Sequence, residues 1–190
     1  MNDAQILVPT SDPSHHLPLA ALRAALAALP APPLDVGRVA LVVERHPGEA
    51  RRTPAVGQLA PGQGLLSDRW AQAERPNPEA EVTLMRADVA ALVCNGQDLS
   101  LPGDNLLVEL DLSAENLPTG SRLQVGEVVL EITAKPHTGC LKFERRFGAD
   151  ARALTGLDEL KAARLRGIHA RVVIGGAVRP GDEVRVLGRA

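Results

Sequence analysis

Cys140 is the residue of this chain best placed to do chemistry. It lies in the segment Lys135-Pro-His-Thr-Gly-Cys-Leu-Lys142, which follows an alternating apolar stretch and is rich in basic and histidine side chains. A thiol surrounded by positive charge ionises readily, and the thiolate is the form that binds a metal or carries sulfur. We therefore predict that Cys140 is a metal ligand or nucleophile. His137 is predicted to orient a ligand or transfer a proton, because its charge is labile near neutral pH; a loop histidine bonded to backbone is the alternative.

The second cysteine, Cys94, has a different setting. It ends the apolar run Ala91-Leu-Val-Cys94 on a predicted helix, where packing accounts for it. Two cysteines are too few for a disulfide framework and lack the paired spacing of a zinc site.

Basic and amide side chains near these motifs are candidates for binding an anion. Lys135 and Lys142 flank the thiol. Arg69 and Arg166 could grip oxygens through two parallel hydrogen bonds, although an internal ion pair would explain each equally well. Asn105 follows Gly103-Asp104 and is either a turn residue or a hydrogen-bonding group of a pocket.

Composition limits the classes of function. A chain of 190 residues favours one domain with a self-sufficient core. The net charge of −2 gives no electrostatic case for nucleic acid, and an aromatic content of 2% argues against base stacking. No apolar run approaches the length of a membrane span, and no basic segment leads into an apolar signal. We expect a cytoplasmic protein that acts on a small molecule, without nucleic acid or membrane.

The elements that must position these residues are mostly short strands. Period-two alternation predicts strands over 36–44, 106–112 and 128–132, with Val39, Leu41 and Val43 sharing one face of the first. Shorter strands are predicted over 82–85, 170–174 and around Val184 and Val186. Helices are predicted over 17–29, 88–93 and 157–163. This pattern indicates a mostly β barrel or folded sheet with a few short helices and an appended N-terminal helix. We divide the chain into an N-terminal extension, residues 1–34, and a β-barrel domain, residues 35–190.

The motifs, taken in order, resemble the MOSC family, named for the C-terminal domain of molybdenum cofactor sulfurases. The resemblance covers roughly residues 36–187 and rests on these blocks: Gly64-Leu-Leu-Ser-Asp-Arg-Trp70, Val82-Thr-Leu-Met85, Gly103-Asp-Asn-Leu106, Gly120-Ser-Arg-Leu-Gln-Val-Gly126, His137-Thr-Gly-Cys140 and the stretch from Arg166-Gly167 to Gly181-Asp182. The chain departs from the family pattern in two places. Ser67-Asp68-Arg69 stands where Gly-Asp-Arg is frequent, and residues 71–78 replace a His-Gly-Gly element.

The resemblance implies a β-rich barrel and a molybdenum cofactor, with Cys140 as the metal ligand or as the sulfur-accepting group. The cofactor would be held by Arg69, Asn105, Lys135, Lys142 and Arg166. The implied activity is either reduction of N-hydroxylated or other N-oxygenated compounds, or sulfur transfer to metal cofactors. A separate flavin or iron–sulfur protein would supply electrons, or another protein would donate sulfur. Pyridoxal phosphate, which is also connected with the family, is not expected in this chain alone, because no surrounding lyase domain accompanies its few lysines.

Two other classes of function stay open from the sequence. A cysteine hydrolase or transferase would use Cys140 as nucleophile with His137 or His169 as base, and would need an oxyanion site. A non-catalytic binding module that has lost the cofactor would fit the altered loop after Arg69.

Overall fold

The computed structural model describes residues 5–190, so the first four residues of the predicted extension lie outside it. Seven strands form a closed barrel in the order β1-β12-β8-β9-β10-β6-β7, with β7 pairing back onto β1. All of these pairs are antiparallel except β6 with β7. The strands are β1 (Val36–Val42), β2 (Glu44–Arg45), β3 (Arg51–Arg52), β4 (Gly57–Ala60), β5 (Gly64–Leu65), β6 (Val82–Arg86), β7 (Leu106–Val108), β8 (Arg122–Val125), β9 (Val128–Ile132), β10 (Ile168–Ile174), β11 (Gly176–Val178) and β12 (Glu183–Gly188).

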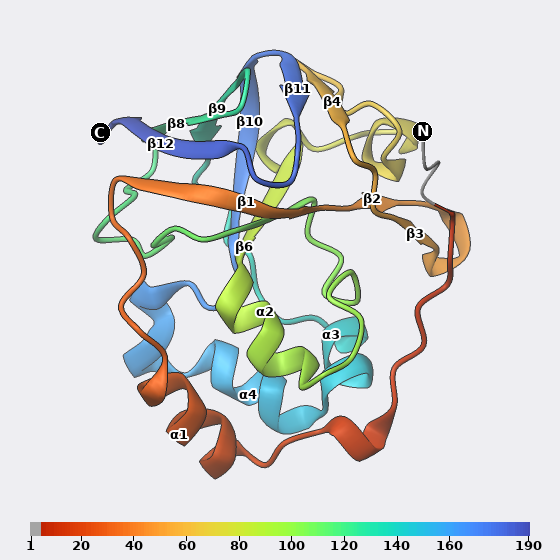
Figure 1. Ribbon diagram of the computed structural model, residues 1–190, viewed down its shortest axis with the longest axis vertical. Helices are drawn as coiled ribbons and strands as arrows, with labels where there is room; N and C mark the ends of the chain where they lie inside the picture. The colour runs from red at the N-terminus through yellow and green to blue at the C-terminus, as the bar shows by residue number, and fades with distance from the viewer. Residues whose placement is uncertain (1–4) are drawn as a thin grey trace.

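The helices gather at one end of the barrel, below the strands in Figure 1. The α-helices are α1 (Leu19–Ala28), α2 (Ala87–Cys94), α3 (Leu141–Phe147) and α4 (Ala149–Gly156), and the 3-10 turns are η1 (Pro13–His15), η2 (Pro47–Glu49), η3 (Arg69–Gln72), η4 (Pro78–Ala80) and η5 (Asp158–Ala163). Two small sheets, β11-β4-β5 and β2-β3, extend from the barrel. The prediction of a mostly β barrel with short helices and an N-terminal helix is confirmed.

Alternation along the strands fills the barrel. In β9, Val128, Leu130 and Ile132 are buried while the residues between them are partly exposed, as a period of two requires. The same inward faces from the other strands complete one apolar core inside the barrel. A second apolar core lies under the helices and includes Leu22 of α1 together with Phe143 and Phe147 of α3. The cysteine segment joins the two, because it leaves β9 and enters α3.

Three details differ from the sequence prediction. The pairing of β1 shifts register between Val39 and Leu41, so Val42 rather than Leu41 follows Val39 into the barrel core, and Leu41 packs against the helices. The strand predicted over 106–112 ends at Val108, although Leu110 and Leu112 still enter the core. The helix predicted over 157–163 is the 3-10 turn η5, and two α-helices that were not predicted, α3 and α4, precede it.

The N-terminal helix α1 packs on the helical end of the barrel domain. The backbone N–H of Leu19 donates to Asp150 of α4 at 3.0 Å, and Leu22 is fully buried in the helical core. The helix therefore covers apolar surface that α2 and α4 would otherwise expose. The boundary at residue 34 stays a prediction.

Candidate functional site

Cys140 lies at the start of α3 with its thiol exposed, whereas Cys94 is buried. Partial burial raises the pKa of the Cys140 thiol, but the N–H groups of Phe143 and Lys142 and the charge of Arg166 lower it, and the net direction is downward. Burial instead raises the pKa of the Cys94 thiol to about 12. Of the two cysteines, Cys140 is therefore the exposed one and the one whose pKa is lowered.

Asp104 connects the cysteine segment to the barrel. This carboxylate is fully buried and accepts hydrogen bonds from Nε2 of His137 at 2.7 Å and from Nη1 of Arg166 at 2.6 Å. Burial alone raises the pKa of Asp104, but the charges of Arg166 and His137 hold it well below its usual range. The Arg166 guanidinium also lies 4.9 Å over the ring of Phe143 in α3. One buried carboxylate thus fixes the positions of two predicted site residues.

His137 also stacks on His169, with the two ring centroids 4.4 Å apart. Nδ1 of His169 lies 3.2 Å from the backbone oxygen of Lys135. Burial, followed by the charge of His137, lowers the pKa of His169 to about 4. Burial and the nearby Arg166 likewise lower the pKa of His137. Both imidazoles are therefore neutral at pH 7.

This histidine pair predicts a stability that depends on pH. The ordinary pKa of His169 is 6.5 and the folded pKa is about 4, so the unfolded chain binds more protons between these values. The contribution of neutral, buried His169 to the free energy of unfolding is therefore complete above pH 6.5 and declines as the pH falls toward 4. We expect the free energy of unfolding to drop by up to about 2 kcal/mol from pH 7 to pH 5. Urea unfolding at both pH values should show a smaller drop for His169→Gln.

The matched control is His15→Gln, since the ring of His15 bonds to the backbone oxygen of Asn95, away from the histidine pair. This control should keep the full pH dependence of the wild type. An equal drop in His169→Gln and in the wild type would contradict the assignment.

Asn105 is buried and its side-chain amide already has partners inside the protein. Its Oδ1 accepts from the backbone N–H of Thr83, and its Nδ2 donates to Asp68 at 3.0 Å. Asp68 in turn accepts two hydrogen bonds from the guanidinium of Arg45, at 2.9 and 2.8 Å. Asn105 therefore holds the Gly103-Asp-Asn loop and the loop of Arg69 together.

Positive charge gathers on the other side of the cysteine segment. We define the arginine cluster as Arg45, Arg51, Arg69, Lys142 and Arg146. Burial and then the charges of Arg146, Arg69 and Arg45 lower the pKa of Arg51 to about 10, which places four guanidinium groups near one another.

Carboxylates compensate only part of this charge. Glu49 forms ion pairs with Lys142 at 2.9 Å and Arg146 at 2.8 Å, and the hydrogen bonds from these two lower its pKa to about 2. The buried guanidinium of Arg51 donates only to backbone oxygens, of Ser100, Glu49 and Ala50. Within residues 5–190, the Arg69 guanidinium makes no hydrogen bond or ion pair. The cluster thus carries more positive than negative charge, which suits an anionic group.

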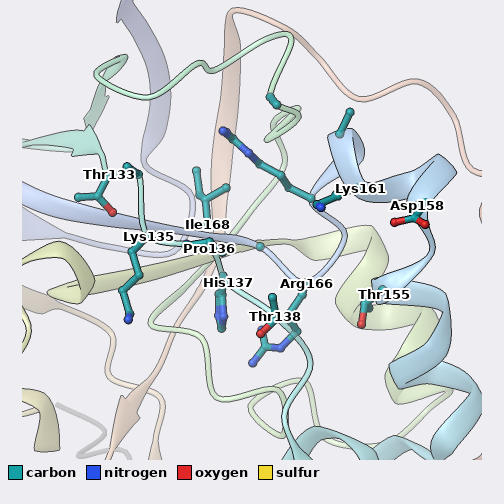
Figure 2. Close-up of a pocket in the computed structure, with 16 residues that line it drawn as sticks. Thr133, Lys135, Pro136, His137, Thr138, Thr155, Asp158, Lys161, Arg166 and Ile168 are labelled. Atoms are coloured by element: carbon teal, nitrogen blue, oxygen red, sulfur yellow. The ribbon is translucent and has the colours of Figure 1, made fainter.

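A cavity of about 620 Å³ opens on the opposite flank, between segments 133–138, 155–162 and 164–168. Figure 2 shows His137 and Arg166 close together at this cavity, with Lys135 and Lys161 projecting on either side of them. Thr138 lines the cavity two residues before Cys140, and the charge of Arg166 reaches the thiol. Cys140 itself is not a lining residue; along the chain it follows Thr138, which lines the cavity, and precedes Lys142, which belongs to the arginine cluster.

The structure therefore distributes the predicted site residues over two basic regions. Lys135, His137 and Arg166 line the cavity, while Arg69 and Lys142 belong to the arginine cluster. Sequence reasoning missed Asp104, which holds His137 and Arg166, and it missed the other basic residues of the two regions, which are Arg45, Arg51, Arg146, Lys161 and Arg164. Among these, Asp104 carried a usable signal, because it directly precedes Asn105 in a motif already singled out.

Within residues 5–190, no three His, Cys, Asp or Glu side chains come together as a group that could hold a metal ion. None of the helices in this part of the chain has the length and apolarity needed to cross a membrane.

Comparison with known proteins gives a family and a fold. A family model described as MOSC domain matches residues 78–185. No curated protein matches the chain. Among solved structures, a hypothetical protein is 18% identical, with a TM-score of 0.59 over 80% of this chain and 70% of that one. The YUAD protein from Bacillus subtilis is 18% identical, with a TM-score of 0.53 over 80% of this chain and 95% of that one. YiiM from Escherichia coli is 16% identical, with a TM-score of 0.53 over 80% and 71%. At sequence identities this low, the structural similarity establishes a shared fold and nothing more.

Proposed function

Since the chain belongs to the MOSC domain family, we propose that it holds a molybdenum cofactor through Cys140 and reduces N-hydroxylated or other N-oxygenated compounds. The observation that carries this proposal is the Cys140 thiol, which is exposed and whose pKa is lowered in part by the charge of Arg166, a residue that lines the cavity. A soft thiolate is a suitable ligand for molybdenum.

The residues present fit such a cofactor. A single thiolate suits a metal that arrives with its other ligands on an organic molecule. The phosphate and dithiolene of that molecule are anionic, and Arg69, which has no side-chain partner within residues 5–190, offers a guanidinium that can bind phosphate with two hydrogen bonds. We assign the anionic part of the cofactor to the arginine cluster and the cavity to the substrate.

Each residue then has a defined task. When bound, the cofactor supplies the two electrons that cleave an N–O bond, and two protons convert the N-hydroxyl compound to an amine and water. Asp104 accepts the Nε2–H of His137, so Nδ1 is the nitrogen left to take up and release a proton at the cavity. Arg166 keeps Asp104 ionised by its charge. Electrons come from a separate flavin or iron–sulfur protein.

Sulfur transfer is the second candidate, and the exposure of Cys140 favours it. A thiolate of lowered pKa can carry a persulfide and hand sulfur to an acceptor that reaches the surface. A cysteine hydrolase is less well supported. Among residues 5–190 neither His137 nor His169 hydrogen-bonds to the thiol, and Nε2 of His137 is already bound to Asp104.

The test uses protein purified from a host that makes the cofactor and from a matched host that cannot make it. We expect about one molybdenum per chain only from the first host. Only that protein should reduce phenylhydroxylamine to aniline when chemically reduced methyl viologen supplies electrons. Equal activity from both hosts, or no molybdenum in either, would contradict the proposal. Persulfide on Cys140 without molybdenum would establish sulfur transfer instead.

A further inference from the structure

The cavity beside Cys140 has features that metal ligation does not explain. Its volume of about 620 Å³ is in the range of small-molecule sites. Apolar surface comes from Pro136 and Ile168 and from the alanines 114, 134 and 162. The walls are therefore suited to a flat apolar body, such as an aromatic or heterocyclic ring.

The charges on the same walls do not balance. Arg166 is neutralised by Asp104, but Lys135 and Lys161 have no ion-pair partner among the residues that the structure describes. Arg164 donates a hydrogen bond to the backbone oxygen of Leu117 at 2.7 Å, and no carboxylate between residues 5 and 190 forms an ion pair with it. The only carboxylate lining the cavity in the described chain is that of Asp158. Three cations thus face one anion, and the cavity keeps a surplus of positive charge.

Two of these cations are close in the chain. Lys161 belongs to η5, and Arg164 is the residue that caps η5. Figure 2 shows Lys161 on one side of the cavity, with Ile168 and Pro136 between it and Lys135. Charged side chains at the rim of an apolar cleft select ligands by charge and orient them.

We propose that this cavity binds an organic anion, with an apolar ring against Pro136 and Ile168 and a carboxylate or phosphate held by Lys161 and Arg164. Such a ligand would leave its opposite end near His137, at the flank of the cavity closest to Cys140. The identification of this anion as the substrate rests on the proposed function. The binding itself does not, because none of the contacts requires a metal.

Calorimetric titration of metal-free protein with benzoate, phenyl phosphate and the neutral benzamide tests the proposal. At least one anion should bind in a saturable manner and more tightly than benzamide. Lys161→Met should weaken that binding about fivefold to tenfold, as loss of a charge-assisted contact predicts, and leave benzamide unchanged. The matched comparison is Lys142→Met, which removes a lysine from the arginine cluster and should leave the affinity of the metal-free protein for these three compounds unchanged. Lys161 and Lys142 are both exposed, so neither substitution should disturb folding.

The two anions separate the possible headgroups. Preference for benzoate identifies a carboxylate ligand, preference for phenyl phosphate a phosphate ligand, and both results support the proposal. It is overturned if benzamide binds as well as the anions, or if no anion saturates. The proposal would also be overturned if Lys142→Met weakened anion binding as much as Lys161→Met, since the anions would then bind at the arginine cluster. Because the protein is metal-free, none of these outcomes depends on whether molybdenum binds.

Discussion

After purification, the Cys140→Ser variant should contain less than about a tenth of the molybdenum that the wild type contains. A serine hydroxyl stays protonated at pH 7 and is a hard ligand, so it cannot replace a soft thiolate. The thiol is exposed, and surface substitutions usually change stability by less than about 0.5 kcal/mol. Elemental analysis and thermal unfolding of the same preparation therefore separate metal loss from unfolding.

The matched control for this substitution is Cys94→Ala. Cys94 is fully buried in the helical core, so its replacement leaves a small cavity and costs about 1 kcal/mol. It should nevertheless keep its molybdenum. Cys140→Ser protein that holds as much molybdenum as the wild type would contradict the ligand role.

Asp104→Asn should be the most destabilising substitution at the site, lowering the free energy of unfolding by about 3–5 kcal/mol. The change removes the carboxylate that pairs with the buried guanidinium of Arg166, and it leaves the Nε2–H of His137 facing a neutral amide. The fully buried environment allows no water to replace the lost charge. Urea unfolding monitored by circular dichroism measures the loss.

Asp158→Asn is the control, because Asp158 is an exposed carboxylate that lines the cavity and is not paired with Arg166 in the described chain. Its replacement should change the free energy of unfolding by less than about 0.5 kcal/mol. A double substitution, Asp104→Leu with Arg166→Met, should recover part of the stability by removing both charges together. Asp104→Asn protein within about 1 kcal/mol of the wild type would show that Arg166 does not depend on this carboxylate.

The barrel could be predicted from the sequence because some of its strands, above all β8 and β9, alternate between buried and more exposed residues. Val128, Leu130 and Ile132 repeat every second residue and are all buried. The register shift in β1 could not be foreseen, since a bulge is set by the pairing with β7 and leaves no mark in the alternation of β1 itself. Helix α3 was not predicted, because most of its residues are charged. Its helical signal was the pair Phe143 and Phe147, which are four residues apart, lie on one face and are both buried.

The sequence singled out Cys140 and His137 of the candidate site, but it did not reveal most of the charged residues around them. Cys140 and His137 stood out because their residue types are rare here and close in sequence. The arginine cluster did not, because arginine is the default cation of the chain and its members come from distant segments. Asp104 entered the sequence analysis only as the neighbour of Asn105, because its contact with Arg166 spans 62 residues and exists only in the folded chain.

X-ray absorption at the molybdenum edge of the purified wild type and of Cys140→Ser tests most directly whether the Cys140 sulfur binds the metal. For this comparison the variant is reconstituted with an excess of cofactor. We predict one sulfur ligand more on molybdenum in the wild type than in the variant. An identical sulfur shell in the two proteins would mean that the metal is held without the thiolate, and Cys140 would lose the role assigned to it.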